Sequence, residues 1–478
     1  MKNSNNPFNQ VELETILSTY NPWWKTSEFA TEVFRRPIFG RVYKDLFSLR
    51  QILSITGPRR VGKTTLLKQV IKELISVKRV DPSQIVYFSF DDPLMMEPVT
   101  RERFFDDLMR WADTKHHGHV VYFFLDEIQR FERWELYLKK YYDLNFPVKF
   151  VISGSASSPI FKKSRESLLG RVKDYHLLPF SFKEYVYFSK AGDAELLEFV
   201  KRAHDFGVKL QRDTIIDWQR ADPDPLGVPP RIFDELTGLL NRYFVEGGFP
   251  EAWTIPDLVE RQAYLFDNQI QKVIFEDLVI ATEFRKPENI KRFYLSLIEQ
   301  PGQEVNLESA SGKIGVSRGM LEKYLPLLEM TELVKSIPKF SKRPLKFRRG
   351  MVKCYLIDLA LRNAILKLGD RLLDDKVMMG FYAENLVFNA LRSFEGIIEL
   401  SFYKENKKDI DFVVNLGGKR YLPVEVKYRD SVDDLGSITH FLKRYDQKFG
   451  IVVTKKFEKN TEDNRLLFIP LPIFLLFF

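Results

Sequence analysis

The stretch GPRRVGKT, residues 57–64, places two glycines, a lysine and a threonine at the spacing of a phosphate-binding loop. In such a loop the glycines let successive backbone N–H groups turn toward phosphate oxygens. Lys63 would reach the β- and γ-phosphates of a nucleotide, and the Thr64 hydroxyl would bind Mg²⁺. We therefore predict a nucleotide site made of Gly57, Pro58, Arg59, Arg60, Val61, Gly62, Lys63, Thr64 and Thr65.

The flanks of this loop predict the elements that must position it. Residues 51–56, QILSIT, form a short apolar run typical of a buried strand. Residues 63–75 carry apolar side chains at helical spacing, so the phosphates would lie at a helix N-terminus, where free N–H groups favour an anion. The alternative is a glycine-rich turn that binds nothing.

Two further apolar runs end in residues that could act on a nucleotide. In VVYFFLDEIQ, residues 120–129, Asp126 would hold Mg²⁺ and Glu127 would orient the attacking water. A buried strand that runs into an acidic turn is the alternative. In VKFVISGSAS, residues 148–157, Ser153 or Ser155 could sense the γ-phosphate, although a simple strand-to-loop turn would have the same sequence.

The composition limits the classes of function. The 478 residues are 45% hydrophobic and allow about three domains. A net charge of +8 permits nucleic-acid binding without establishing it. The single cysteine excludes an internal disulfide. The cysteine and the six scattered histidines do not have the spacing of a zinc site. We expect a cytoplasmic protein, since the N-terminus is polar. The apolar run 466–478 is too short to span a bilayer and contains two prolines; we interpret it as a final core strand, with a membrane or partner contact as the alternative.

Changes in sequence character along the chain predict five parts. A helical lead-in with Trp23 and Trp24 as aromatic anchors covers 1–48, and a nucleotide-binding core with a five-stranded parallel sheet covers 49–180. A mostly helical segment at 181–286 would act as a lid. A winged helix is predicted at 287–375, with Ser317 capping its second helix, and an α/β domain at 376–478.

The winged-helix segment contains a strongly basic run. Residues 335–353 carry eight lysines and arginines and no acid. A basic wing of this kind could contact the phosphates of duplex DNA. It could equally pack on the protein as a solvated hairpin, and the sequence leaves both interpretations open.

The last domain gathers three acids and a lysine that could form a second site. Glu384 lies near the start of a predicted helix, Asp411 on a strand, and Glu425 and Lys427 two residues apart on the next strand. Neighbouring carboxylates can hold Mg²⁺, and a lysine beside them can polarise a water. The alternative is a buried ion-pair cluster in a domain without catalytic activity.

The order of these parts resembles a family of prokaryotic AAA-type ATPases related to the STAND class. The resemblance covers the chain from about residue 31, through GPRRVGKTTLL, FLDEIQ, SGS, GRVKDYHLLPFSFKEY, EGGFPEA, KCYLIDLALRNAI and AENLVFNAL…DIDFVV…PVEVKY. It implies an α/β fold with a P-loop NTPase sheet, a helical lid, a winged helix and a restriction-endonuclease-like, PD-(D/E)xK-type C-terminal domain. It also implies ATP and Mg²⁺ as ligands and Arg171 as an arginine finger, with a structural salt bridge as the alternative for Arg171.

The leading hypothesis is a Mg²⁺-dependent ATPase that couples ATP turnover to the winged-helix and nuclease-like region and acts on DNA. The second hypothesis is a nucleotide-dependent regulatory switch whose nuclease-like domain is inactive and binds a protein partner. We expect no membrane contact, and assembly into a homo-oligomer is left open.

Overall fold

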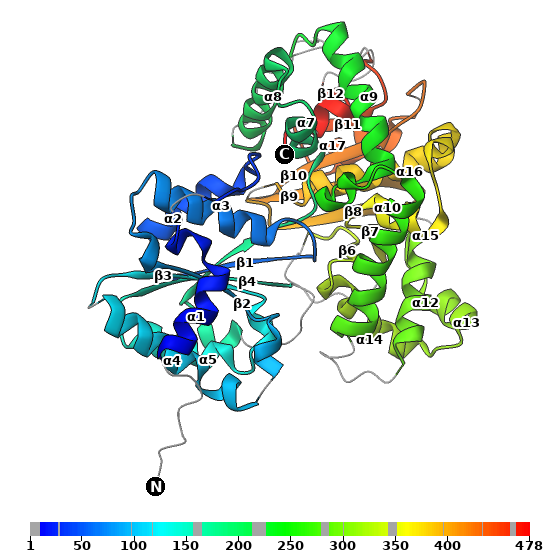
Figure 1. Cartoon of the computed structure of the whole chain (residues 1–478). Helices are drawn as coiled ribbons and strands as arrows, with labels where there is room; N and C mark the ends of the chain where they lie inside the picture. The colour runs from blue at the N-terminus through cyan, green and yellow to red at the C-terminus, as the bar shows by residue number, and fades with distance from the viewer. Residues whose placement is uncertain are drawn as a thin grey trace. The chain divides into compact units, whose positions relative to one another are not determined.

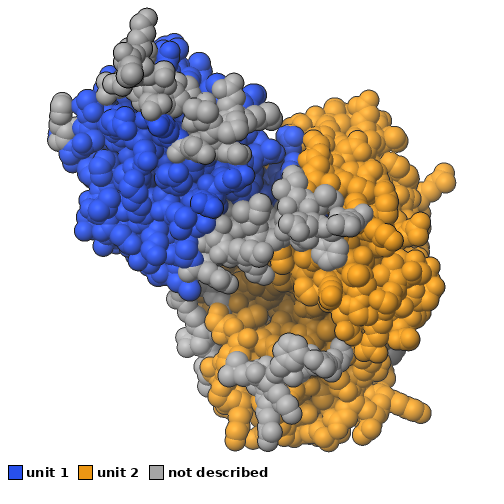
Figure 2. All heavy atoms as spheres, turned by 90° about the horizontal axis from the view of Figure 1, so that it is seen from below, with its two compact units in different colours: residues 1–178, 277–283 blue, residues 179–276, 284–478 orange. Residues whose placement is uncertain are grey.

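The chain folds as two compact units, residues 1–178 with 277–283 and residues 179–276 with 284–478 (Figure 2). The computed structural model describes residues 10–26, 29–96, 98–116, 118–155, 165–212, 226–278, 286–299, 301–342, 351–394, 396–432, 434–458 and 465–478. Within these ranges, no helix combines the length and the apolar character that crossing a membrane requires.

Unit 1 is built on a five-stranded parallel sheet, as the five apolar runs of its sequence predict. Its strands are β1 (Ile52–Gly57), β2 (Ile85–Ser89), β3 (Val121–Asp126), β4 (Val148–Ser155) and β5 (Val172–His176). Their order in the sheet is β2-β3-β4-β1-β5. Because β4 lies between β1 and β3, the carboxyl ends of these three strands meet at one edge of the sheet.

Helices cover both faces of this sheet (Figure 1). The helices α1 (Gln10–Tyr20), α4 (Pro98–His116) and α5 (Trp134–Asp143) pack on one face, and α2 (Ile38–Ser48) and α3 (Lys63–Ser76) pack on the other. Alternate strand residues serve the two cores: Ile52 faces the first and Leu53 the second. The indole N–H groups of Trp23 and Trp24 both donate to the Ile85 carbonyl at 3.0 Å, which fastens the N-terminal segment to β2.

Unit 2 contains a mixed five-stranded sheet. Its strands are β8 (Glu399–Glu405), β9 (Lys408–Gly417), β10 (Arg420–Lys427), β11 (Gly450–Thr454) and β12 (Leu466–Pro470), in the order β12-β11-β10-β9-β8. The β9–β10 pair is an antiparallel hairpin, while β10, β11 and β12 run parallel. The helix α17 (Gly436–Arg444) packs on this sheet through Ile438, Phe441 and Leu442.

The C-terminal run differs from its predicted form. It was expected to be one strand over 466–478, but β12 ends at Pro470, and the buried helical turn α18 (Leu471–Phe474) follows. A proline removes a backbone donor and fixes φ, so two prolines two residues apart end the strand pairing.

The remaining helices of unit 2 surround this sheet and a small second one. They are α7 (Phe182–Ser189), α8 (Ala194–Arg212), α9 (Pro230–Glu246), α10 (Leu258–Leu265), two π-helical turns (Phe266–Gln271 and Val273–Asp277), α12 (Pro287–Ile298), α13 (Leu307–Ile314), α14 (Arg318–Met330), α15 (Leu359–Leu366) and α16 (Lys376–Leu391). Short 3₁₀ turns in the chain span Pro22–Trp24, Pro82–Gln84, Pro93–Met96, Ile128–Arg130, Arg165–Leu168, Pro250–Thr254 and Asp370–Asp374. The predicted lid helices α7 to α10 belong to unit 2; their action as a lid stays a prediction.

The segment predicted as a winged helix, residues 287–375, contains the helices α12, α13 and α14, then two antiparallel strands, β6 (Val334–Pro338) and β7 (Val352–Leu356), and after them α15 and a 3₁₀ turn. Ser317 occupies the N-cap position of α14, as predicted. Its side chain makes no capping hydrogen bond, so the predicted side-chain cap is absent. Of the basic run, residues 343–350 lie outside the described residues.

A buried polar joint fastens the helices of unit 2 to one another. The Asp358 carboxylate accepts hydrogen bonds from Gly248 N at 2.6 Å and Ala360 N at 2.8 Å. Asn363 on α15 donates to the carbonyls of Phe244 and Val245 at the end of α9. Two segments of the resembling family's pattern, EGGFPEA and KCYLIDLALRNAI, therefore meet here, and polar side chains of the second satisfy backbone groups in and just before the first.

We predict that Gly247→Ala destabilises unit 2 strongly. Gly247 has φ 68° and ψ −162°, a conformation nearly restricted to glycine, and an added Cβ would lie 2.1 Å from Asp358 Oδ1. The expected loss is about 3 kcal/mol or more in the free energy of unfolding, measured by thermal or urea denaturation.

Gly238→Ala is the matched control for this prediction. Gly238 lies inside α9, and an added Cβ would meet no atom within 4 Å. Alanine should therefore leave stability unchanged or raise it by about 1 kcal/mol. Equal melting temperatures for the two variants would contradict the proposed close packing at Gly247.

Candidate functional site

The loop between β1 and α3 has the backbone that its glycines predict. An added Cβ on Gly57 would lie 2.0 Å from the carbonyl oxygen of Leu177, so only glycine allows this close approach. Gly62 has φ 94° and forms the N-cap of α3. Between them, Arg60 is exposed at φ 64° and Val61 is fully buried, while Pro58 is buried and Arg59 half-buried. The loop thus curls around the N-terminus of α3, whose N–H groups can bind an anion.

Lys63 and Thr64 begin α3 and extend toward different partners. The buried Lys63 ammonium group donates to the carbonyl oxygens of Gly57 at 3.2 Å and Pro58 at 2.8 Å. The Thr64 hydroxyl donates to Asp126 Oδ2 at 2.5 Å. The next residue, Thr65, is half-buried on the same helix. The lysine is therefore held at the loop, and the threonine reaches across to the end of β3.

The Asp126 carboxylate is the centre of this site. Besides the bond from Thr64, it accepts hydrogen bonds from Tyr87 Oη at 3.0 Å, from the backbone N–H of Glu127 at 3.1 Å and from the hydroxyl of Ser153. These donors come from β2, β4 and α3, and from the residue that follows β3. A hydroxyl and a carboxylate side by side are oxygen ligands that suit Mg²⁺, so the residues present fit the ion that the sequence implies.

Glu127 follows Asp126 in a left-handed backbone conformation, with φ 50° and ψ 39°. This conformation is uncommon for residues other than glycine, asparagine and aspartate, and strained residues of this kind cluster at functional sites. Burial raises the pKa of the Glu127 carboxyl group, and Gln129 donates a hydrogen bond to its Oε2 at 2.5 Å. A carboxyl group with a raised pKa is a stronger base once it is ionised.

The two candidate sensor serines lie at different points on β4. Ser153 pairs with Ile55 of β1 and contacts Asp126, whereas Ser155 is buried at the strand end opposite Gly57. The geometry thus connects Ser153 with the predicted metal ligand and places Ser155 beside the phosphate-binding loop.

Arg171 forms the ion pair that was the alternative to an arginine finger. Its guanidinium group donates from Nε to Asp143 Oδ1 at 2.7 Å and from Nη2 to Asp143 Oδ2 at 3.1 Å. Such a two-bond pairing orients the side chain toward α5. The arginine-finger role stays a prediction.

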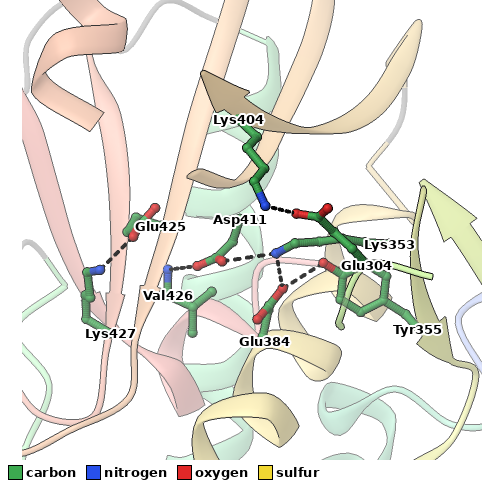
Figure 3. Close-up of polar contacts among 9 residues, drawn as sticks. All are labelled: Glu304, Lys353, Tyr355, Glu384, Lys404, Asp411, Glu425, Val426 and Lys427. Carbon is green, nitrogen blue, oxygen red and sulfur yellow. Dashed lines mark hydrogen bonds and ion pairs between the residues drawn. The ribbon is translucent and has the colours of Figure 1, made fainter. Parts of the chain in front are cut away.

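The second predicted cluster, in unit 2, is also brought together (Figure 3). Lys427 Nζ lies 2.6 Å from Glu425 Oε1 on the same strand, and Asp411 Oδ2 accepts a hydrogen bond from Val426 N at 2.9 Å. Glu384 approaches from α16. It lies in the middle of that helix, because α16 already begins at Lys376, capped by the Asp375 carboxylate; the prediction that Glu384 is near the helix start was wrong.

Two residues that the sequence analysis missed complete this cluster. Lys353 Nζ on β7 lies 2.9 Å from Glu384 Oε1 and 3.5 Å from Asp411 Oδ1, and Tyr355 Oη donates to Glu384 Oε1 at 2.8 Å. Lys353 was counted in the basic run of the wing, but its half-buried side chain is a partner of the acids. The available signal was a lysine and a tyrosine two residues apart in an otherwise apolar run, VKCYLI.

Burial and mutual repulsion set the charges of the cluster. Burial, with a contribution from Asp411, raises the pKa of Glu384 to about 7 and that of Glu425 to about 8. Burial alone would lower the pKa of Lys353, but its attraction to Glu384 and Asp411 outweighs burial and raises that pKa. Across the described part of the chain, no three acidic, histidine or cysteine side chains converge on one metal position. The metal-binding role of the cluster stays a prediction.

Comparisons with known proteins assign the phosphate-binding unit more firmly than the rest. Residues 49–186 match a family model described as an AAA domain, and residues 237–372 and 379–474 match two domains of unknown function, DUF8612 and DUF4143. The AAA match indicates a P-loop ATPase-like domain in unit 1. The C-terminal matches carry no statement of function, so the STAND, winged-helix and nuclease-like assignments remain proposals.

The similar proteins come from archaea and bacteria. An uncharacterized protein of Methanocaldococcus jannaschii is 25% identical over 372 residues, which are 76% of this chain and 72% of that protein. A second uncharacterized protein of the same organism is 22% identical over 96% of this chain and 91% of its own length. An uncharacterized protein of Haemophilus influenzae is 22% identical over 85% of this chain and 90% of its own length.

A solved structure of C. elegans PCH-2 matches 53% of this chain and 63% of that chain, less than two thirds of its length, with 15% identity. The TM-score of 0.28 is too low for this likeness to support an argument about the fold or the function.

We predict that Tyr87→Phe weakens the use of Mg²⁺ without unfolding unit 1. The substitution removes only the hydroxyl group that orients the Asp126 carboxylate. Loss of such an outer contact to a metal ligand typically costs about tenfold or more in metal affinity. The measurement is the Mg²⁺ dependence of nucleotide binding, and Tyr122→Phe on β3, whose ring packs in the core of α2 and α3, is the control. Identical Mg²⁺ curves for Tyr87→Phe and the wild type would exclude the positioning role of Tyr87.

Proposed function

We propose that the chain is a Mg²⁺-dependent AAA-type ATPase whose nucleotide state is coupled to its C-terminal region. The observation that carries this proposal is the contact between the Thr64 hydroxyl and the Asp126 carboxylate, with Glu127 next in the chain. A phosphate-binding loop alone explains nucleotide binding. A paired magnesium ligand set and an adjacent half-buried acid also provide for hydrolysis.

In this proposal each residue has a defined task. The loop N–H groups and Lys63 bind the β- and γ-phosphates, while Thr64 and Asp126 hold Mg²⁺. When bound with ATP, Mg²⁺ would neutralise charge that develops on the transferred phosphoryl group. Glu127 accepts a hydrogen bond from the attacking water and orients it, and Ser153 keeps the Asp126 carboxylate in position. Arg171 precedes β5, and its carbonyl oxygen accepts a hydrogen bond from Ile52 N at the start of β1, the sheet edge opposite the phosphate-binding loop, so we propose no task for it at this phosphate site.

Coupling between the units is supported by how the chain connects them. Among the described residues, the chain passes between the units at 178/179 and 276/277. The first of these connections starts beside the phosphate-binding loop. Leu177 O lies against Gly57, and the Arg36 guanidinium group donates to Val61 O at 3.1 Å and Leu178 O at 2.8 Å. A rearrangement of the loop on nucleotide binding would therefore act directly on this connection.

For the ATPase we predict separate effects of Lys63→Ala and Glu127→Gln. Loss of the Lys63 charge should weaken ATP binding about 10- to 100-fold, because a charge-assisted contact to phosphate disappears. Glu127→Gln should retain ATP binding but lose about 10²-fold or more in single-turnover hydrolysis, because only the water-orienting acid changes.

Lys68→Ala, an exposed position on the same helix, is the control and should behave as wild type. Wild-type turnover in Glu127→Gln would remove Glu127 from its proposed role. Normal ATP affinity in Lys63→Ala would argue against the assigned phosphate contact.

For the C-terminal region we propose a nuclease-like domain that binds DNA through the preceding winged helix and does not cut it. Lys353 lies between two of the acids that a nuclease would need for metal binding, which favours the inactive form. A protein partner in place of DNA is the alternative. The start of the basic run packs on the C-terminal domain of the same chain: Phe340 lies among Tyr403, Tyr421, Phe441 and Tyr445, and Lys342 Nζ lies 5.1 Å from the Tyr445 ring.

The basic run predicts salt-dependent DNA binding. Replacing Lys342, Arg343, Arg348 and Arg349 together by glutamine should weaken duplex binding for all sequences and flatten the salt dependence, with a slope reduced by up to about 3 to 4. Fluorescence anisotropy over a salt series measures both quantities. A control that exchanges lysine for arginine, and the reverse, at the same four positions keeps the charge and should keep the slope. Unchanged affinity and slope in the glutamine variant would mean that the run faces protein.

A further inference from the structure

We infer that Lys353 is the resident cation of the carboxylate cluster and that Glu384, Asp411 and Glu425 bind a divalent metal ion only when this lysine is withdrawn. The inference takes one element from the proposed nuclease-like character of the C-terminal region, namely that the cation competing with Lys353 is a divalent metal ion. It does not depend on ATP hydrolysis, which belongs to the other unit.

The position of the ammonium group is the first support. Lys353 Nζ lies between two carboxylates, 2.9 Å from Glu384 Oε1 on helix α16 and 3.5 Å from Asp411 Oδ1 on strand β9 (Figure 3). The side chains of Lys353 and Glu384 are 15% and 10% exposed, so water screens this interaction little. The Glu384 carboxylate, which is buried, and the Asp411 carboxylate, which is 21% exposed, would repel each other, and a cation between them removes that repulsion.

The second support is the way in which β7 is held in place. Tyr355 lies two residues after Lys353, on the same strand face, and its hydroxyl donates to the same Glu384 oxygen at 2.8 Å. Its ring stacks on Phe388 of α16 at a centroid distance of 4.5 Å. Backbone hydrogen bonds from Gly302 to Cys354 and from Val305 to Val352 hold the other edge of β7. Lys353 is therefore positioned by a strand that is held in place on both sides.

A third, independent observation concerns Glu425. Its Oε1 is paired with Lys427 at 2.6 Å, but among the described residues its Oε2 is buried without a hydrogen-bond partner. A buried carboxylate oxygen without a donor is costly and is therefore rare. Lys353 is engaged with Glu384 and Asp411 and does not contact this oxygen. Glu425 Oε2 is therefore left as an oxygen that could bind a metal ion.

These contacts imply a competition between two kinds of cation. With Lys353 in place, the acids are neutralised from within the chain and an added divalent ion would place further positive charge beside a buried ammonium. With Lys353 removed, three carboxyl groups remain with Lys427 alone as their lysine partner in the cluster. Carboxylate oxygens are the ligands that Mn²⁺ and Mg²⁺ prefer, so metal binding would then relieve the uncompensated charge.

The test is Mn²⁺ binding to full-length Lys353→Met, without nucleotide, by titration calorimetry and by thermal unfolding with and without Mn²⁺. Methionine keeps the apolar stem and removes the charge. We expect a melting temperature below that of the wild type in the absence of metal, recovery with Mn²⁺, and a Kd at least about tenfold tighter than that of the wild type. Adding Asp411→Asn should abolish the gain.

Lys404→Met is the matched control. Lys404 lies on the neighbouring strand β8 and pairs with Glu304 outside the three acids, so its loss should not create Mn²⁺ affinity. No gain of Mn²⁺ binding in Lys353→Met would overturn the inference, as would equally tight binding by the wild type.

If Lys353→Met does not fold, the double variant Lys353→Met with Glu384→Gln decides the matter. It removes one positive and one negative charge together, so it should fold and be more stable than Lys353→Met. A double variant that is no more stable would also overturn the inference. ATP binding measured on the same samples reports on unit 1 separately, so a failure of the proposed ATPase would not be mistaken for a failure here.

Discussion

The buried carboxylate of Asp126 needs donors from several directions, and the core of unit 1 is arranged to supply them. The donors come from α3, β2 and β4, which are separated in the sequence and meet only through the strand order β2-β3-β4-β1-β5. If β4 did not lie between β1 and β3, Ser153 could not reach this carboxylate. The order of the sheet and the chemistry of the site are thus one constraint, because a buried charge is tolerated only when it is fully hydrogen-bonded or paired.

Unit 2 meets the same constraint in a different way. Glu384, which is buried, and Asp411, which is half-buried, share the ammonium group of Lys353 on β7, while Tyr355 Oη and Val426 N add one neutral donor to each acid. Hydroxyl donors leave a carboxylate able to bind a metal ion, whereas an ammonium group neutralises it. This difference is why the proposed activity is placed in unit 1 and why the C-terminal region is proposed to bind rather than to cleave.

The family resemblance and the structure support each other to different extents along the chain. The AAA match covers residues 49–186, the region where loop, strands and acids agree with a P-loop ATPase-like domain. For the rest, the motifs EGGFPEA and KCYLIDLALRNAI acquire a physical explanation that does not require a ligand. They form a buried polar joint in which Asp358 and Asn363 satisfy backbone groups near the end of α9.

Local patterns in the sequence determined the phosphate-binding loop, the five parallel strands and the β9–β10 hairpin. Each of these depends on residues close together in the chain, through glycine conformation, apolar alternation or a turn. Local patterns were less accurate at boundaries, where Pro470 ended a predicted strand and α16 began before its expected start. Only the tertiary structure decided that Tyr87 contacts Asp126 and that Arg171 pairs with Asp143. It also decided that Lys353, although part of the basic run in the sequence, forms an ion pair with Glu384. These contacts join residues on separate elements, and no spacing in a single sequence records which elements will pack together.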